Sequence, residues 1–424
     1  MTQREFAIQV VKTLQAAGHQ ALWAGGCVRD QILGRDPKDY DVATSAHPDV
    51  VRQLFGKKRT LPIGASFGVI TVLSPKVTEV APEDGDGSEA SKIVQHVIEV
   101  ATFRRDTGYS DGRRPDGVEF TDAREDAIRR DFTINGMFYD PIKEEVIDYV
   151  GGQEDLSAKK IRAIGNPHER IEEDKLRMLR GIRFTSTFEF ELDSQTLDAI
   201  QKHASEIGLV SGERIGAEMR RMLVSPNRRS AVELLRFSGL LAEILDDGKS
   251  LFDGADWSAI LARLDVLDSN EFVAAAAILL EAYIEVHGIA PVFDRWKLSN
   301  DERKSIEWIC KNWIKLVDAD QSPWSEIQPL LLKSDVASAL QVAEAHQKSS
   351  AGQSDSRGIA FCRERLRWPR EKLDPKPFLD GADLIMLGIE RGPRFKEILD
   401  AVRRAQLDHK IETIEQAQKL ALTY

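Results

Sequence analysis

The feature that most constrains the fold is the uneven distribution of strand-forming sequence along the chain. Segments rich in β-branched residues, such as residues 67–73 and 97–103, lie within the first 150 or so residues. After Gly151-Gly152 such segments almost disappear, and from about residue 168 the apolar residues recur at helical spacing. A chain of 424 residues is long enough for two or three cores. The sequence therefore predicts a head of strands and helices followed by an all-helical remainder.

The first 45 or so residues contain a glycine pair between a strand and a helix. Residues 5–17 form an amphipathic pattern, residues 21–24 and 40–44 are short strand candidates, and residues 28–33 are a helix candidate. Gly25-Gly26 lets the backbone approach an anion closely, and the helix start offers free N–H donors. An ordinary strand-to-helix turn has the same composition. The spacing does not fit GxGxxG, which disfavours a Rossmann dinucleotide site.

Charge and cysteine usage exclude several classes of protein. The net charge of −11 argues against a general nucleic-acid coat protein, although local arginine clusters can still bind RNA. The three cysteines are far apart and form no CxxC pair, which favours a reducing, cytoplasmic location and no zinc site. No run of about 18 apolar residues predicts a membrane span, and the first residues do not resemble a signal peptide.

The triplet Asp39-Tyr40-Asp41 is the central candidate for chemistry. If both aspartates lie on one strand, the two-residue period places their carboxylates on one face, where they repel unless a cation lies between them. Such hard oxygen ligands suit Mg²⁺ that bridges to substrate phosphates. An isolated DxD is more often a turn. Glu99 is a third candidate acid, because a carboxylate within an apolar strand either binds metal, faces solvent at an edge, or is neutralised by Arg104-Arg105.

Two later clusters combine cations with hydrogen-bonding groups. Arg130, Asp131 and Asn135 offer a phosphate-binding cation, an acceptor and an amide suited to a ribose. Asp174 and Arg177 fall at the i, i+3 spacing of a helix face, where an acceptor and a donor fork can match a base edge. A surface ion pair is the alternative interpretation of the second cluster.

In this order, the motifs resemble the class II tRNA nucleotidyltransferase and bacterial poly(A) polymerase family. The resemblance is strong over residues 20–225 and weak over residues 383–417. Residues 226–380 contain no recognisable motif. The resemblance rests on five ordered segments, which are residues 25–30 with Asp39-Tyr40-Asp41, residues 99–104, residues 129–135, residues 173–177, and Arg214-Ile215 with Glu218 and Leu223.

The resemblance implies an α+β fold, with a polymerase-β-type nucleotidyltransferase head (a mixed sheet with helices) over residues 1–151. A helical neck over 152–226 and a helical, RNA-binding body and tail over 227–424 follow. It implies two Mg²⁺ ions held by Asp39, Asp41 and Glu99. It assigns the incoming nucleotide to the residues Gly25, Gly26, Arg29, Arg130, Asp131, Asn135, Asp174, Arg177 and Arg180.

Within the family, the sequence favours CCA addition to the tRNA 3′ end from CTP and ATP. The loop at residues 108–118 disfavours an enzyme that adds only the two cytidines. The stretch Ile63-Gly64-Ala65-Ser66-Phe67-Gly68 lacks the basic residues that some poly(A) polymerases carry there. Poly(A) or A-only addition stays open, as does an inactive RNA-binding module. The sequence departs from the family's pattern in two respects. It contains a long insertion at residues 76–94, expected to be a mobile hairpin loop, and it lacks a His-Asp phosphohydrolase motif in its C-terminal half. The sequence leaves the oligomeric state open.

Overall fold

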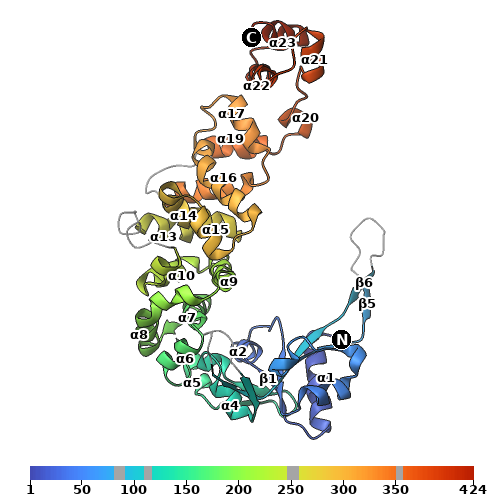
Figure 1. Cartoon of the computed structure of the whole chain (residues 1–424), viewed down its shortest axis with the longest axis vertical. Coiled ribbons are helices and arrows are strands. Elements are labelled where there is room, and N and C mark those ends of the chain that lie inside the picture. The colour runs from blue at the N-terminus through green and yellow to red at the C-terminus, as the bar shows by residue number, and fades with distance from the viewer. Residues whose placement is uncertain (81–90, 109–116, 246–256, 350–356) are drawn as a thin grey trace. The chain divides into compact units, whose positions relative to one another are not determined.

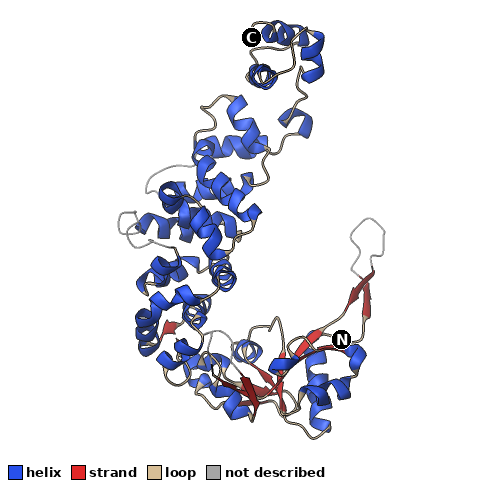
Figure 2. Cartoon of the chain, viewed as in Figure 1, coloured by secondary structure: helices blue, strands red, loops and turns tan. Residues whose placement is uncertain are grey.

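The computed structural model describes residues 1–80, 91–108, 117–245, 257–349 and 357–424. The centres of the two predicted loops, at residues 82–88 and 109–116, lie outside these ranges. The chain divides into two compact units, one formed by Met1–Glu218 and Leu234–Ile244 and the other by Met219–Glu233 and Leu245–Tyr424. Among the described residues, every strand belongs to the first unit (Figures 1 and 2).

A seven-stranded mixed sheet forms the centre of the first unit. Its order is β11-β10-β1-β2-β7-β4-β3, and only β2 and β7 pair in parallel. The predicted mixed sheet is therefore confirmed. The strands are β1 (Ala21–Ala24), β2 (Asp41–Thr44), β3 (Thr60–Leu61), β4 (Val69–Leu73), β7 (Val97–Thr102), β10 (Phe138–Asp140) and β11 (Glu145–Ile147).

Helices cover both faces of this sheet. Helix α1 (Gln3–Ala16) begins at a capping box between Thr2 and Glu5 and buries its apolar stripe against β1, β2 and β7. On the opposite face, Ala24, Ala43 and Phe138 pack with the alanines of α4 (Ala123–Ile128). Since residues i and i+2 share a face, Asp41 lies on the α4 side together with Ala43.

Three small two-stranded sheets accompany the main sheet. Strands β5 (Val77–Val80) and β6 (Ser91–Val94) pair as the arms of the predicted hairpin, and β8 (Arg104–Thr107) pairs with β9 (Gly117–Phe120). Strands β12 (Lys160–Ile161) and β13 (Glu191–Leu192) form a short parallel pair. The prediction that strands almost disappear after Gly152 is therefore confirmed, apart from these four residues.

The remainder is helical, as predicted. In the second unit, α14 is apolar on all sides over residues 272–280 and lies against α13, α16 and α18 as the centre of a helical core. None of the helices in the described ranges is both long and apolar enough to cross a membrane. Besides α1 and α4, the α-helices within the described ranges are α2 (Gly26–Ile32), α3 (Pro48–Phe55), α5 (Gly152–Ser157), α6 (Pro167–Glu173), α7 (Leu176–Phe188), α8 (Ser194–His203), α9 (Gly212–Leu223), α10 (Arg228–Phe237), α11 (Leu240–Ile244), α13 (Trp257–Val266), α14 (Phe272–His287), α15 (Ala290–Trp296), α16 (Asn300–Val317), α17 (Trp324–Leu331), α18 (Val336–Ser349), α19 (Arg357–Arg365), α20 (Arg370–Leu373), α21 (Gly381–Met386), α22 (Arg394–Leu407) and α23 (Ile414–Ala421).

Gly152 packs directly under the short 3₁₀ helix η3 (Thr133–Asn135), which carries Asn135. A Cβ at Gly152 would lie 2.7 Å from Met137 Cγ and still closer to the Thr133 carbonyl oxygen. Gly152→Ala should therefore lower the free energy of unfolding by about 1–3 kcal/mol, the usual cost of overpacking. Urea unfolding measures this change. Gly208→Ala is the matched control, because its Cβ meets nothing within 4 Å. Equal stability of the two variants would contradict the close packing at Gly152.

Candidate active site

Two of the three predicted acids lie side by side at the centre of the sheet. Asp41 opens β2 and Glu99 lies in β7, and the parallel register pairs these two residues directly. Both are exposed, whereas Tyr40 between Asp39 and Asp41 is buried. Asp39 precedes the strand, so the condition under which both aspartates lie on one strand is not met, and the strand expected over residues 40–44 begins at Asp41. The alternation of exposed and buried residues nevertheless continues from Asp39 to Asp41.

Glu99 is exposed to solvent, as one alternative expected, but neither the edge strand nor neutralisation by Arg104-Arg105 is found. Strand β7 lies between β2 and β4, so Glu99 is not on an edge strand. Arg104 donates to the Phe67 carbonyl oxygen and to Asp106, while Arg105 pairs with Glu119 at 2.7 Å. These two arginines are thus engaged with other acceptors.

The Asp41 carboxyl occupies an environment that disfavours its charge. Partial desolvation of the carboxyl group by the residues packed around it, followed by the negative charge of Glu99, raises its pKa from 3.8 to about 6, although Arg130 partly offsets this. Asp39 adds a further repulsion. Such repulsion between carboxylates fits a site that receives cations. Within the described ranges, no three acidic, histidine or cysteine side chains converge closely enough to form a complete metal site. Mg²⁺ usually completes its octahedron with water and phosphate oxygens, which suits an incomplete protein shell.

The glycine pair admits an arginine rather than closing a simple turn. Gly25 precedes α2 with a φ of 73°, and a Cβ there would lie 3.1 Å from Nη1 of Arg130. The left-handed backbone and the close approach both favour glycine at this position. The guanidinium of Arg29, on α2, lies 3.5 Å from the position of a Cβ on Gly26. The group that approaches Gly25 in the structure is Arg130, and the approach of an anion to the glycine pair stays a prediction.

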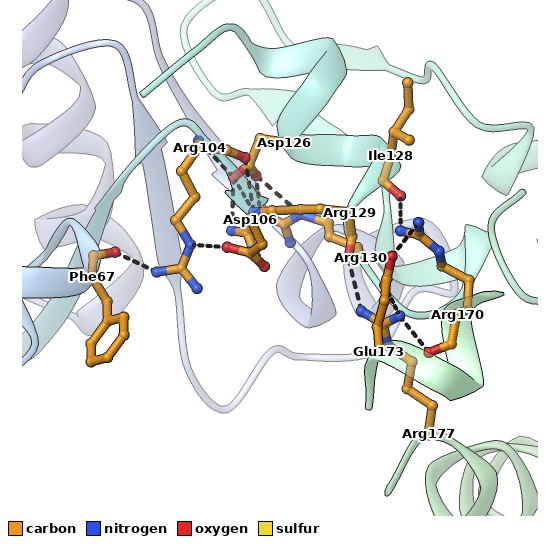
Figure 3. A network of polar contacts seen from close by, with 10 residues as sticks. All are labelled: Phe67, Arg104, Asp106, Asp126, Ile128, Arg129, Arg130, Arg170, Glu173 and Arg177. Atoms are coloured by element: carbon orange, nitrogen blue, oxygen red, sulfur yellow. Dashed lines mark hydrogen bonds and ion pairs between the residues drawn. The ribbon is translucent and has the colours of Figure 1, made fainter. Parts of the chain in front are cut away.

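Asp126 is a buried carboxylate that holds two arginines at the edge of the site (Figure 3). Its Oδ1 accepts from Nε and Nη2 of Arg129 at 2.9 and 2.7 Å, and from the backbone N–H of Arg104. Its Oδ2 accepts from Nε and Nη2 of Arg130 at 3.2 and 2.9 Å. Burial alone would raise the pKa of Asp126, but the charges of Arg130 and Arg129 outweigh it and keep the pKa low.

Asp131 and Asn135 form a second buried set with Arg180 and Arg29. Asp131 Oδ2 accepts from Nε and Nη2 of Arg180 at 2.8 and 2.6 Å, and its Oδ1 accepts from Asn135 Nδ2 and the Phe132 N–H. Asn135 Oδ1 in turn accepts from Nη1 of Arg29 at 2.6 Å. Burial would raise the pKa of Asp131, but the Arg180 charge and these hydrogen bonds keep it low.

The predicted shared helix face of Asp174 and Arg177 is wrong. Helix α6 ends at Glu173 and α7 begins at Leu176, so Asp174 lies in the break with φ −146° and ψ 103°. Arg177 pairs with Glu173 at 2.6 Å instead. It also donates to the backbone carbonyls of Arg170 and Arg129 at 2.8 and 3.0 Å.

The partner of Asp174 is Arg214 of α9. Nη1 and Nη2 of Arg214 donate to Oδ1 and Oδ2 of Asp174 at 3.0 and 2.7 Å. Oδ1 also accepts from the backbone N–H of Leu176 at 3.1 Å. The tertiary packing, rather than the local helix spacing, thus provides the ion pair.

These groups surround one cavity of about 510 Å³ in the first unit. Seven arginines and four aspartates line it, so its wall is positive although the chain as a whole is negative. Asp39 and Glu99 are not among its lining residues, whereas Asp41 is. The cavity is lined by Gly25, Gly26, Arg29, Asp41, Arg104, Asp106, Arg129, Arg130, Asp131, Asn135, Asp174, Leu176, Arg177, Arg180, Phe184 and Arg214.

Sequence reasoning missed several groups of this site. Asp126 precedes Arg129 by three residues and Arg130 by four. This is the spacing of ion pairs on one helix face, so the sequence alone could have indicated the contact. Arg214 belongs to a recognised motif, but no local pattern connects it to Asp174. Phe184 lies one helical turn beyond Arg180, and its ring lies 5.2 Å from that guanidinium carbon and 4.2 Å from that of Arg183.

Comparisons with known proteins agree in pointing to one family. Residues 21–162 match the family model described as the poly A polymerase head domain. Residues 189–251 match the model described as a probable RNA and SrmB-binding site of polymerase A. A CCA-adding enzyme of Levilactobacillus brevis is 30% identical over 430 residues, which span 99% of this chain and 97% of that protein.

Solved structures of similar fold cover the whole chain. The CCA-adding enzyme of Bacillus stearothermophilus in complex with CTP is 27% identical, with a TM-score of 0.75 over 100% of this chain and 98% of that one. The CCA-adding enzyme of Thermotoga maritima, complexed with tRNA, is 19% identical and has a TM-score of 0.62 over 99% and 94% of the two chains. At that identity the second likeness supports the fold alone.

The raised pKa of Asp41 generates a prediction about stability and pH. Between pH 3.8 and about 6 the folded protein binds more protons than the unfolded chain, so ionisation of Asp41 lowers stability as the pH rises. In EDTA, Asp41→Asn should raise the free energy of unfolding above pH 6, and this gain should vanish below about pH 4. Urea unfolding across this range is the measurement. Added Mg²⁺ should reduce the gain, because a cation stabilises the ionised wild type. A gain that is equal at every pH would contradict the charge repulsion.

Proposed function

The chain belongs to the family of CCA-adding enzymes, and on this premise we propose that it adds CCA to the 3′ end of tRNA. CTP and ATP are the substrates, and no nucleic acid serves as the template. Its three cysteines are all free thiols, which supports a cytoplasmic site of action.

The observation that carries the proposal is the arginine-lined cavity. It contains Asp41 together with Asp174 and Arg177, whose hydrogen-bonding groups can read a base. The excess of guanidinium groups suits a triphosphate, since arginine binds phosphate oxygens through paired donors.

The acids Asp39, Asp41 and Glu99 are the proposed ligands of two Mg²⁺ ions. When bound, such ions activate the RNA 3′-OH and neutralise the charge of the departing pyrophosphate. The register pair of Asp41 and Glu99 supports this assignment, because two strands hold the acids at fixed separation. The raised pKa of Asp41 supports it as well, since a carboxylate that is repelled by its neighbours gains most from a cation.

Arginines and the Asn135 amide are the proposed contacts of the triphosphate and ribose. Arg130 lies over Gly25, where the backbone also offers the N–H groups at the start of α2. Arg29, beside Gly26, donates to the Asn135 side-chain oxygen. An ionised carboxylate has about four acceptor positions, and Asp131 has four donors on its two oxygens. We therefore assign Asp131 to holding Arg180 and Asn135 toward the nucleotide.

Asp174 and Arg177 are the proposed readers of the base. Cytosine and adenine each present an amino donor beside a ring acceptor, whereas uracil and guanine present a carbonyl at the position of the amino group. Three of the five N–H donors of Arg177 bind Glu173 and two carbonyls. Among the described residues, two donors remain, one on Nε and one on Nη2. Rejection of uracil and guanine follows because they would leave buried groups unpaired.

The identity of the added sequence tests the function directly. The purified full-length chain is offered tRNA that ends at the discriminator base, with CTP, ATP and Mg²⁺, and the product ends are sequenced. Addition of C, C and A in this order is the expected result. A run of adenosines would instead support the poly(A) alternative, and no incorporation with intact RNA binding would support an inactive RNA-binding module.

Loss of the acids generates a second prediction. Asp41→Ala and Asp39→Ala should each lower the Mg²⁺-dependent rate of incorporation more than tenfold, which corresponds to about 1.4 kcal/mol in the barrier. Affinity for tRNA should stay within about threefold of the wild type, because phosphate contacts elsewhere supply most of the binding energy. Asp148→Ala is a suitable control variant, since among the described residues that carboxylate accepts from the N–H groups of its own turn, at residues 150, 151 and 153, and does not line the cavity. Retention of more than a tenth of the rate would refute the metal-ligand assignment.

A further inference from the structure

The carboxylate of Asp174 has its acceptor positions almost filled before any nucleotide binds. Oδ1 accepts from Nη1 of Arg214 and from the Leu176 N–H, while Oδ2 accepts from Nη2 of Arg214. An ionised carboxylate oxygen offers about two acceptor positions. Oδ1 is therefore saturated among the described contacts, and Oδ2 retains one position.

One free acceptor position matches what the proposed substrates offer. On this edge of cytosine or adenine, the ring nitrogen accepts from a donor such as Arg177. The neighbouring amino group then needs one acceptor. We propose that Arg214 is a positioning residue for base selection, which holds the Asp174 carboxylate so that only Oδ2 faces the incoming base with one open acceptor position. This inference rests on the proposed function, because it assumes that Asp174 contacts the base.

The position of Asp174 in the chain explains why it needs such a partner. It lies in the break between α6 and α7, so no helical turn restricts its side-chain rotamer. The Leu176 N–H alone fixes one oxygen and leaves the plane of the carboxylate free to turn. The two parallel bonds from Arg214 fix this plane, since a guanidinium fork and a carboxylate are coplanar when they pair bidentately.

The Arg214–Asp174 ion pair also differs from an ion pair on a solvated surface. The side chains of Arg214 and Asp174 are 22% and 18% exposed, and both line the arginine-rich cavity. Arg220 on the same helix provides a comparison, because it pairs bidentately with Glu302 at 2.7 and 2.6 Å but does not line this cavity. The two arginines thus form similar bonds, and only Arg214 can affect the choice of base through its partner.

The experiment measures incorporation of each of the four nucleotides singly by the full-length chain on tRNA that ends at the discriminator base. Arg214→Ala should raise the ratio of UTP to CTP incorporation roughly tenfold, the usual effect of losing one well-placed hydrogen-bonded contact. The rise should come mainly from a higher KM for CTP. Arg214→Lys should restore selectivity only in part, because lysine keeps the charge but lacks the planar fork. Arg220→Ala, the control, should keep the wild-type ratio.

A double-mutant cycle tests whether Arg214 acts through Asp174. In the background of Asp174→Ala, Arg214→Ala should change the UTP to CTP ratio no further, since the group that it positions is gone. A wild-type ratio in a folded Arg214→Ala variant would overturn the proposal. If Arg214→Ala does not fold, Arg214→Lys decides in its place: a ratio equal to that of the wild type overturns the proposal, and a raised ratio supports it. Failure of the proposed function is a separate result, in which the wild type itself incorporates neither CTP nor ATP.

Discussion

Mutual repulsion among seven arginines is the constraint on which the site depends. Guanidinium groups that line one cavity repel each other, and the fold holds them together by placing buried or half-buried carboxylates among them. Asp126 holds Arg129 and Arg130, Asp131 holds Arg180, and Asp174 holds Arg214. Most of these contacts use two N–H groups of one arginine, so each fixes an orientation as well as a charge.

The consequence for ligand binding is preorganisation. An arginine that is already fixed by a carboxylate loses little side-chain entropy when it contacts a phosphate. Because four aspartates accompany seven arginines, the cavity keeps a positive excess while its parts stay rigid. This local excess coexists with a chain of net charge −11, whose remaining surface is correspondingly acidic.

The acids of the sheet, unlike the arginines, are not each paired with an opposite charge. Asp41 and Glu99 face each other across β2 and β7, and the first lies in an environment that raises its pKa to about 6. Carboxylates gathered with a shortage of positive partners are costly unless a cation joins them. The site therefore contains an anionic part and a cationic part. The first fits metal ions and the second fits phosphates, and both belong to the first unit.

The sequence by itself determined the features that depend on neighbours in the chain. Strand-forming residues confined to the head, the glycine pair before a helix, and the exposed-buried alternation from Asp39 to Asp41 are local patterns, and the mixed sheet with a helical remainder follows the predicted order. Only the tertiary structure decided which groups are partners. Arg214 meets Asp174 across 40 residues, Arg180 meets Asp131 across 49, and Arg29 meets Asn135 across 106. Periodicity reports which residues share a face of one helix or strand. It contains no information on which faces meet, because this is set by the packing of elements that are distant in the chain.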